Sequence, residues 1–150
     1  MTSETKQDQA ATTGNSEHET ARAVALRQVL RIQPERMEAE ELELAAGLQL
    51  GLRMALQEGK PVFVDDAGQP QAFNPLSDWD HFGRVLTNID IVIGPHPMHD
   101  DPANPDKVTG YWYSAHSFMT GTKTEGYELR DTVLTTVAKR LEHDTKYPAD

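Results

Sequence analysis

The chain has 150 residues, of which 37% are hydrophobic, and a formal net charge of −10 at pH 7. This length suits one domain with a modest core and a tail, and the absence of cysteine excludes disulfides, thiolate metal sites and cysteine nucleophiles. No stretch reaches the roughly 18 apolar residues of a membrane-spanning helix, and the N-terminus has no apolar signal-peptide core. We therefore expect a soluble, cytoplasmic protein that makes no membrane contact.

The negative charge is concentrated in the middle of the chain. Residues 61–106 carry eight acids and a single base, Arg84. Phosphate contacts need clustered Lys and Arg, so direct nucleic-acid binding is disfavoured. An acidic face can attract a basic partner, although acidic surfaces also serve solubility alone.

The first 58 residues predict a tail followed by two helices. Residues 1–16 are small and polar, and they cannot bury enough surface to offset the entropy of ordering. Ser16 and Glu19 have the spacing of a capping box, which opens the first helix. The expected organisation is a disordered tail over residues 1–16 and a helical extension of two helices over residues 17–58.

The second helix is expected over residues 35–58. Its leucines fall at steps of three and four residues, which is typical of one apolar face, and Gly59 is expected to close it as a left-handed cap. Gly47 and Gly51 form a Gly-x-x-x-Gly pattern, which indicates close helix packing in the core or at a subunit contact. A homo-oligomer formed through residues 36–58 is therefore one expectation.

Residues 59–146 predict a separate sandwich domain. Residues 94–107 hold four prolines and are expected as a long loop, which makes the strands on either side an antiparallel pair. Residues 120–126 are expected as a second loop. Strands are expected at 61–64, 71–73, 91–93 and 108–118, with helices that begin at Ser77 and Glu128.

The fold class expected from this order is α+β. A small, mostly antiparallel sheet is covered by helices on both faces, as an α/β/α sandwich with an N-terminal helical extension. The helix after Ser77 is expected to dock on the sheet through one apolar face, which consists of Trp79, Phe82, Val85, Leu86 and Ile89. Gly83 lies in the middle of this helix at a cost of about 1 kcal/mol relative to alanine, which indicates close approach to a strand or to a neighbouring side chain.

Several short pieces of residues 60–142 resemble a known family. These pieces are Asn74-Pro75, Asp78-Trp79, Gly83, Ile91 to Ile93, Tyr111-Trp112-Tyr113 and Asp131-Thr132. In this order they resemble the phage ABA sandwich domain, a small family carried by bacteriophages and prophages, with helices on both sides of a short sheet. The resemblance implies a phage or prophage origin and an accessory protein. It supplies no catalytic residues.

Residues 94–101 are the segment in which potential metal ligands are most concentrated. His96 and His99, together with Asp100, have ligand types that suit a divalent metal ion. However, His-x-x-His between prolines lacks helical ligand spacing, so a structural loop is the plainer interpretation and no metal or cofactor is expected. A hydrolase would pair His81 or His116 with Ser114 or Ser117, but no nucleophile elbow is present.

Five residues are candidates for ligand binding: Arg84, His96, His99, Tyr111 and Tyr113. Strand alternation puts Tyr111 and Tyr113 on one face and the intervening tryptophan on the other. One face can therefore line a pocket beside the 94–107 loop, although aromatic strand residues are also typical of a core. Arg84, as the only base among many acids, would suit an anionic ligand.

The sequence as a whole favours a non-enzymatic accessory protein that binds a host protein or a small ligand. For a phage protein, counter-defence is an associated hypothesis. One alternative is an acidic DNA mimic, whose carboxylates imitate phosphates and inhibit a DNA-binding protein. The other is a metal-dependent enzyme built on His96, His99 and Asp100.

Overall fold

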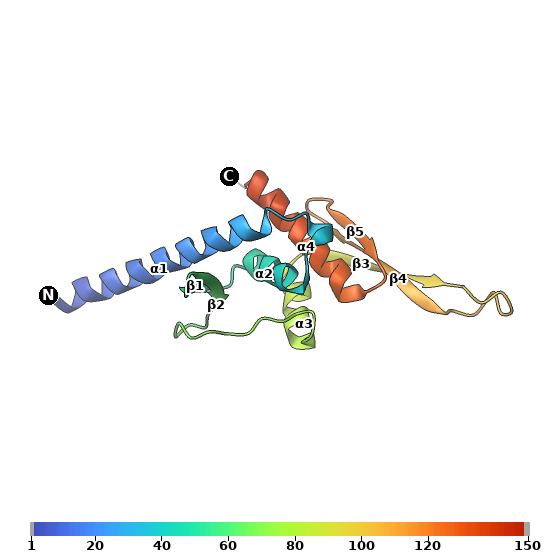
Figure 1. The fold of residues 1–150 in the computed structure, drawn as a ribbon, viewed down its shortest axis with the longest axis horizontal. Coiled ribbons are helices and arrows are strands. Elements are labelled where there is room, and N and C mark those ends of the chain that lie inside the picture. Colours follow the sequence, from blue (N-terminus) through green and yellow to red (C-terminus); the bar gives the residue numbers. More distant parts are fainter. Residues whose placement is uncertain (1, 149–150) are drawn as a thin grey trace.

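The computed structural model describes residues 2–148 and has an α+β fold (Figure 1). Over these residues it contains four α-helices, a short 3-10 helix, a two-stranded sheet and a three-stranded sheet, and both sheets are antiparallel. The predicted class is confirmed. The elements are α1 (Thr2–Val29), η1 (Pro34–Arg36), α2 (Ala39–Leu50), β1 (Met54–Gln57), β2 (Lys60–Phe63), α3 (Trp79–Asn88), β3 (Ile91–Met98), β4 (Gly110–Ser117), β5 (Lys123–Gly126) and α4 (Leu129–Lys146).

α1 begins at Thr2, inside the segment expected to be a disordered tail. The expected cap Ser16 therefore lies within a helix instead of at its start. The C-terminal part of α1 is anchored because Ala25 and Val29 are fully buried, whereas the N-terminal part projects from the body (Figure 1). An anchored helix extends at little cost through a segment without proline, because each added residue gains one backbone hydrogen bond.

The predicted second helix is too long. α2 ends at Gly51, whose φ of 73° gives the left-handed cap expected at Gly59. Residues 54–57 instead form β1, which pairs antiparallel with β2. Glu58 (φ 52°) and Gly59 (φ 79°) make the two-residue turn between them, and positive φ at both positions is the signature of a type I′ hairpin turn.

The helical extension and the predicted sandwich domain form one folded unit. The boundary expected between residues 58 and 59 falls inside the β1–β2 turn. One hydrophobic cluster includes Ala25 of α1, Leu48 of α2 and Leu134 of α4, and α2 packs directly against α4. The first 58 residues therefore complete the core instead of extending from it.

The Gly-x-x-x-Gly pattern is used within the chain. A Cβ on Gly47 would lie 2.0 Å from Cζ of Phe63, so the glycine lets the β1–β2 hairpin approach α2 closely. Gly51 ends the helix, as described above. The structure thus accounts for both glycines without a subunit contact, and the homo-oligomer through residues 36–58 stays a prediction.

The three-stranded sheet has the order β3-β4-β5 and is covered by α4 on one face. Ala115 and Ser117 are fully buried on this face. The opposite face carries the cross-strand pair His96 and Trp112 and the 46% exposed side chain of Val92. Helices were expected on both faces of one sheet, but α4 and then α2 are stacked on the same side, because part of the expected sheet forms the separate β1–β2 hairpin.

β3 is longer than predicted and takes in the first part of the expected loop. Pro95 lies opposite Tyr113 and Pro97 lies opposite Tyr111 in a continuous antiparallel ladder with β4, which confirms the predicted pairing. β3 is an edge strand, so both proline nitrogens face the free edge, where no N–H is needed. The expected loop at 120–126 is also wrong in part, because residues 123–126 form β5.

The strand expected at residues 71–73 is absent from the described chain, where Val64 and Pro70 form only an isolated bridge. β2 pairs instead with β1, whose residues were expected in a helix. The closing helix α4 begins one residue after its cap Glu128, as expected, and buries Val133, Val137 and Leu141.

α3 is capped by Asp78, whose carboxylate accepts hydrogen bonds from two N–H groups of the first turn at 2.9 and 3.3 Å. The expected cap, Ser77, lies one residue too early. Trp79 was expected on the buried face but is 61% exposed. A Cβ on Gly83 would meet no atom within 4 Å, so the predicted close approach at this glycine is wrong. The buried face of α3 consists of Phe82 and Val85, followed by Ile89.

Candidate functional site

The structure separates the five residues predicted to bind a ligand. Arg84 is exposed on α3, and among the described residues no ion pair or side-chain hydrogen bond involves its guanidinium. His99 lies beyond the end of β3, where its Nδ1 is 3.1 Å from the carbonyl oxygen of Lys107. Strand alternation places Tyr111 and Tyr113 on the α4 side of the sheet and His96 on the opposite side. These residues do not converge on one site.

His96 is held in a stack with Trp112. The ring centroids are 3.9 Å apart with an interplanar angle of 14°, and Nε2 lies 3.0 Å from Oγ of Ser114. Gly94 leaves room for this pair, since a Cβ there would lie 2.8 Å from the serine Oγ. A Ser–His pair is part of a hydrolase constellation, but within residues 2–148 no carboxylate is hydrogen-bonded to His96 to orient it. The pair therefore fixes the imidazole against the indole.

The ligands of the proposed metal enzyme are also engaged elsewhere. His96 contacts Ser114, His99 contacts Lys107, and Asp100 lies near Thr109. Over the described part of the chain, no three imidazole or carboxylate side chains come together in a way that could hold a metal ion. The geometry does not support a metal centre at residues 96–100.

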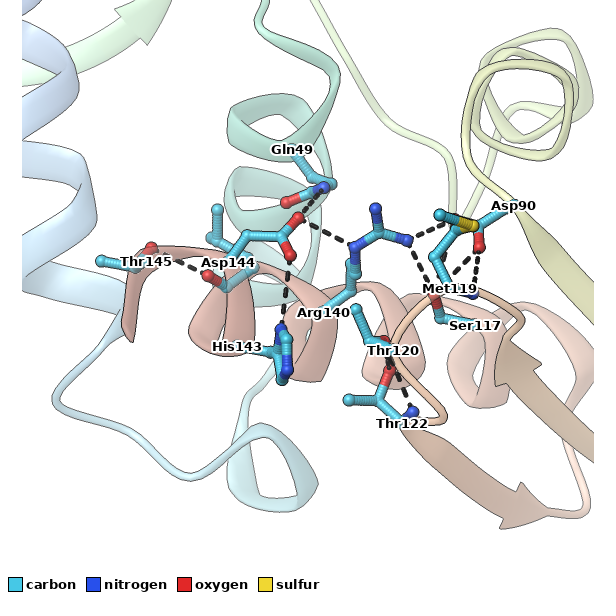
Figure 2. A network of polar contacts seen from close by, with 11 residues as sticks. Gln49, Asp90, Ser117, Met119, Thr120, Thr122, Arg140, His143, Asp144 and Thr145 are labelled. Atoms are coloured by element: carbon cyan, nitrogen blue, oxygen red, sulfur yellow. Dashed lines mark hydrogen bonds and ion pairs between the residues drawn. The ribbon is translucent and has the colours of Figure 1, made fainter. Parts of the chain in front are cut away.

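A polar network ties α2, α4 and the end of β4 together (Figure 2). Arg140 donates from Nε to Asp144 at 2.8 Å and from Nη1 to Asp90 and to Oγ of Ser117. Gln49 of α2 donates to the same Asp144 carboxylate at 3.0 Å. No local sequence pattern indicates this network, because its members come from four separate segments of the chain.

The pKa shifts show that the network is internally compensated. Burial alone would raise the pKa of Asp90, but hydrogen bonds from the Met119 N–H and the Arg140 guanidinium lower it overall. The pKa of Asp144 is also lowered, because hydrogen bonds from Gln49 and the Arg140 guanidinium outweigh the effect of its burial. Burial would lower the pKa of Arg140, yet its two carboxylate partners raise it. Because the charges satisfy one another, we assign this network a structural role.

A groove of about 790 Å³ runs between α2, β2 and residues 70–74. Leu44, Val62 and Phe63 contribute apolar lining, and Glu43 adds a carboxylate from α2. Phe73 closes one side, with its ring edge-to-face against Phe63 at 5.8 Å. The groove exists because the β1–β2 hairpin lies close to α2, so a helix at residues 54–57, as predicted from the sequence, is incompatible with it.

Glu43 is the unusual residue of this groove. Its Oε2 accepts the N–H of Leu76 at 3.2 Å. Burial raises the pKa of Glu43, and the Leu76 N–H and the nearby His81 counteract this rise only in part. A partly buried carboxylate with a raised pKa is more typical of a binding site than of a structural ion pair.

His81 does not line the groove itself, but it contacts two residues that do. Its ring stacks on Phe73 with a centroid distance of 5.6 Å, and its Nδ1 accepts the N–H of Asn74 at 2.9 Å. The accepted hydrogen bond fixes the proton of a neutral ring on Nε2, which lies 3.7 Å from Asp78. His81 is therefore oriented by its neighbours and shapes the groove instead of acting as a free base.

Family models, curated proteins and solved structures show no match to this chain. The resemblance to the phage ABA sandwich domain therefore stays a prediction, and the groove is interpreted from its own geometry. Among residues 2–148, none of the helices has the length and apolar character needed to cross a bilayer.

Proposed function

We propose that the protein is a non-enzymatic binding module whose groove takes up an extended, basic segment of a partner protein. The observation that carries this proposal is Glu43, a half-buried carboxylate in a groove with apolar walls. The stem of a Lys or Arg side chain would pack on those walls while its charged head pairs with the carboxylate. An open groove suits an extended segment better than a small molecule, which is usually enclosed.

The charge of the surroundings supports a basic partner. Glu40 lies one helical turn before Glu43 and also lines the groove, and Lys60 is the single base among the lining residues. The chain as a whole carries a net charge of −10, and the two acids Asp65 and Asp66 follow β2 closely in the sequence. A negative charge of this kind accelerates the approach of a positively charged partner.

The groove is favoured over the DNA-mimic alternative because several central acids already have structural roles. Asp65 accepts two N–H groups of its own turn, Asp78 caps α3, and Asp90 belongs to the Arg140 network. Acids fixed in this way do not form the evenly spaced exposed row that phosphate mimicry requires. A cytoplasmic location belongs to the same proposal and is supported by the lack of cysteine.

The proposal is tested with a capped pentapeptide, acetyl-Ala-Leu-Arg-Leu-Ala-amide, and its analogue with Gln in place of Arg. We expect the Arg peptide to shift backbone amide signals of α2, β2 and residues 70–74 in a nitrogen–proton correlation spectrum. Glu43→Gln should weaken binding by about 10-fold or more, as expected for loss of one charge-assisted contact. Equal binding of the two peptides, or shifts confined to other surfaces, would contradict the proposal.

Two further measurements separate lost binding from lost folding. Glu58→Gln removes an equally negative side chain in the β1–β2 turn, outside the groove, and should leave peptide binding unchanged. Because the folded-state pKa of Glu43 is raised, its carboxylate costs stability at neutral pH, and this cost disappears as pH falls through that pKa. Glu43→Gln should therefore be at least as stable as the wild type at pH 7 in a urea titration.

A further inference from the structure

A second concave feature lies on the open face of the three-stranded sheet, away from the groove. It is a slot of about 260 Å³ lined by Trp112 of β4, by Glu125 and Gly126 of β5, and by Tyr127. Tyr127 is 78% exposed, although it directly precedes the cap of α4. Two aromatic rings and one carboxylate therefore share a small hollow at the surface.

The indole of Trp112 is fixed before any ligand arrives. His96 stacks on one side of it at 3.9 Å and is itself held by its contact to Ser114. His96 lies on β3, whereas the slot residues other than Trp112 lie on β5 or follow it, so they flank β4 from opposite sides in the sheet. A ring that is already oriented loses little conformational freedom on binding.

The position of Tyr127 is set by Gly126. A Cβ at this glycine would lie 2.5 Å from Oγ1 of Thr132, so the end of β5 lies directly against α4. The chain then turns into the helix, and the tyrosine is left on the surface. The backbone at Gly126 therefore places Tyr127 at the slot beside Trp112.

The carboxylate of Glu125 already attracts a cation. Its Oε1 lies 3.1 Å from Nζ of Lys123, and both side chains are more than half exposed. An exposed ion pair of this kind is weak, so a cation that also contacts the aromatic rings can replace the lysine.

We propose that this slot binds a cationic alkylammonium head group between Trp112 and Tyr127, with Glu125 as its counter-ion. The faces of aromatic rings carry partial negative charge and attract cations, most strongly for tryptophan. The slot uses no residue of the groove and does not rest on the function proposed there. An anionic ligand is disfavoured because the slot contributes a carboxylate and the whole chain carries a charge of −10.

The experiment uses the full chain with Trp79→Phe, which leaves Trp112 as the single tryptophan because the chain contains two. Choline and its neutral isostere 3,3-dimethylbutan-1-ol are titrated separately, while the Trp112 indole N–H signal and the tryptophan fluorescence are recorded. We expect a saturable response to choline and a much weaker response to the alcohol. Equal responses would overturn the proposal, because they would mean that the slot recognises shape without charge. A missing response to choline would overturn it as well.

Variants test the two parts of the slot separately. Glu125→Gln should weaken choline binding by about three- to tenfold, the effect expected for one exposed or partly desolvated charge contact. Tyr127→Ala should abolish the response, whereas Tyr127→Phe should retain it. Glu58→Gln serves as the charge-matched control and should leave it unchanged. Undiminished binding by Tyr127→Ala with a native circular dichroism spectrum would overturn the proposal.

The source of the cation is distinguished by a third probe, N-acetyl-trimethyllysine methylamide. A tighter response to this probe than to choline would show that the slot prefers a modified protein side chain, and the reverse order would show that it prefers a free small cation. Either order supports recognition of the alkylammonium group. If the slot did not bind alkylammonium groups, the proposal for the groove would be unaffected, because the Arg peptide and Glu43→Gln test a different surface.

Discussion

The contact between Gly47 and Phe63 allows a prediction whose sign is opposite to that of ordinary helix propensity. Replacing a glycine inside a helix by alanine normally stabilises the protein by about 1 kcal/mol. In Gly47→Ala, however, the new methyl group would lie 2.0 Å from Cζ and 2.6 Å from both Cε atoms of the Phe63 ring. The ring must therefore move, although Phe73 packs against it at 5.8 Å.

The expected net effect follows from two competing magnitudes. Overpacking of a core typically destabilises a protein by about 1–3 kcal/mol. This overlap is severe, so we expect a destabilisation of about 3 kcal/mol from the clash alone. After the helix-propensity gain of about 1 kcal/mol, we expect Gly47→Ala to be destabilised by about 2 kcal/mol. Gly83→Ala is the matched control, because a Cβ there meets nothing within 4 Å and only the gain remains.

The measurement is urea-induced unfolding followed by the helical circular dichroism signal at pH 7. Phe63→Leu, made alone and together with Gly47→Ala, completes a double-mutant cycle. The smaller side chain should accept the methyl group, so the double variant should be more stable than the sum of the single effects predicts. If Gly47→Ala were as stabilising as Gly83→Ala, or if the cycle were additive, the proposed packing of the hairpin on α2 would be wrong.

Three further predictions concern the network, a helix cap and the domain boundary. Arg140→Met should destabilise the protein by about 1–3 kcal/mol at pH 7, less than a fully buried pair because Asp90 and Asp144 are partly solvated. The folded-state pKa values of Asp90 and Asp144 are lowered, so the stabilisation by their ion pairs is present above the ordinary pKa of aspartate and disappears as pH falls. The urea midpoints of the wild type and of Arg140→Met should therefore converge toward pH 2. Asp78→Ala should cost about 1 kcal/mol in the same titration through loss of the α3 cap, whereas Ser77→Ala should cost little; the opposite order would restore the cap expected from sequence. A chain that begins at Gly59 should show no cooperative thermal unfolding, because it lacks β1 and the core residues of α1 and α2; a cooperative transition would re-establish the predicted boundary.

The sequence was most informative where one interpretation of a pattern dominated. The β-branched and aromatic residues of β4 and the four-residue spacing of apolar residues in α4 predicted a strand and a helix, and both are present. Residues 54–57 were more difficult, because Met, Ala, Leu and Gln all suit a helix and Leu56 continues the apolar spacing of the preceding helix. These residues form a strand because Gly51 ends α2 before them, and because Glu58 and Gly59 form the hairpin turn after them. Two glycines eight residues apart each suit a helix end, and local pattern alone does not choose between them.

The candidate sites depended on partners that are distant in sequence. Of the five predicted residues, only His96, Tyr111 and Tyr113 lie on the paired strands β3 and β4, and the ladder places His96 and Tyr111 on opposite faces. Glu43 was visible only as one of several acids in a helix, and its burial arises from the hairpin and from residues 70–74. Tyr127 was assigned no role, because its exposure beside Trp112 results from the contact of Gly126 with α4.

The prolines of β3 limit how this protein can associate with others. An unpaired strand edge is a template on which a further strand can grow, whether from a partner or from another copy of the same chain. Pro95 and Pro97 have no backbone N–H to donate at that edge. A strand that paired with Ile91 and Ile93 would therefore lose its hydrogen bonds before the tip of the hairpin. Without these prolines, a long projecting hairpin rich in aromatic residues would be prone to edge-to-edge aggregation. With this edge blocked, the faces of the molecule remain available for recognition, and both proposed sites lie on faces.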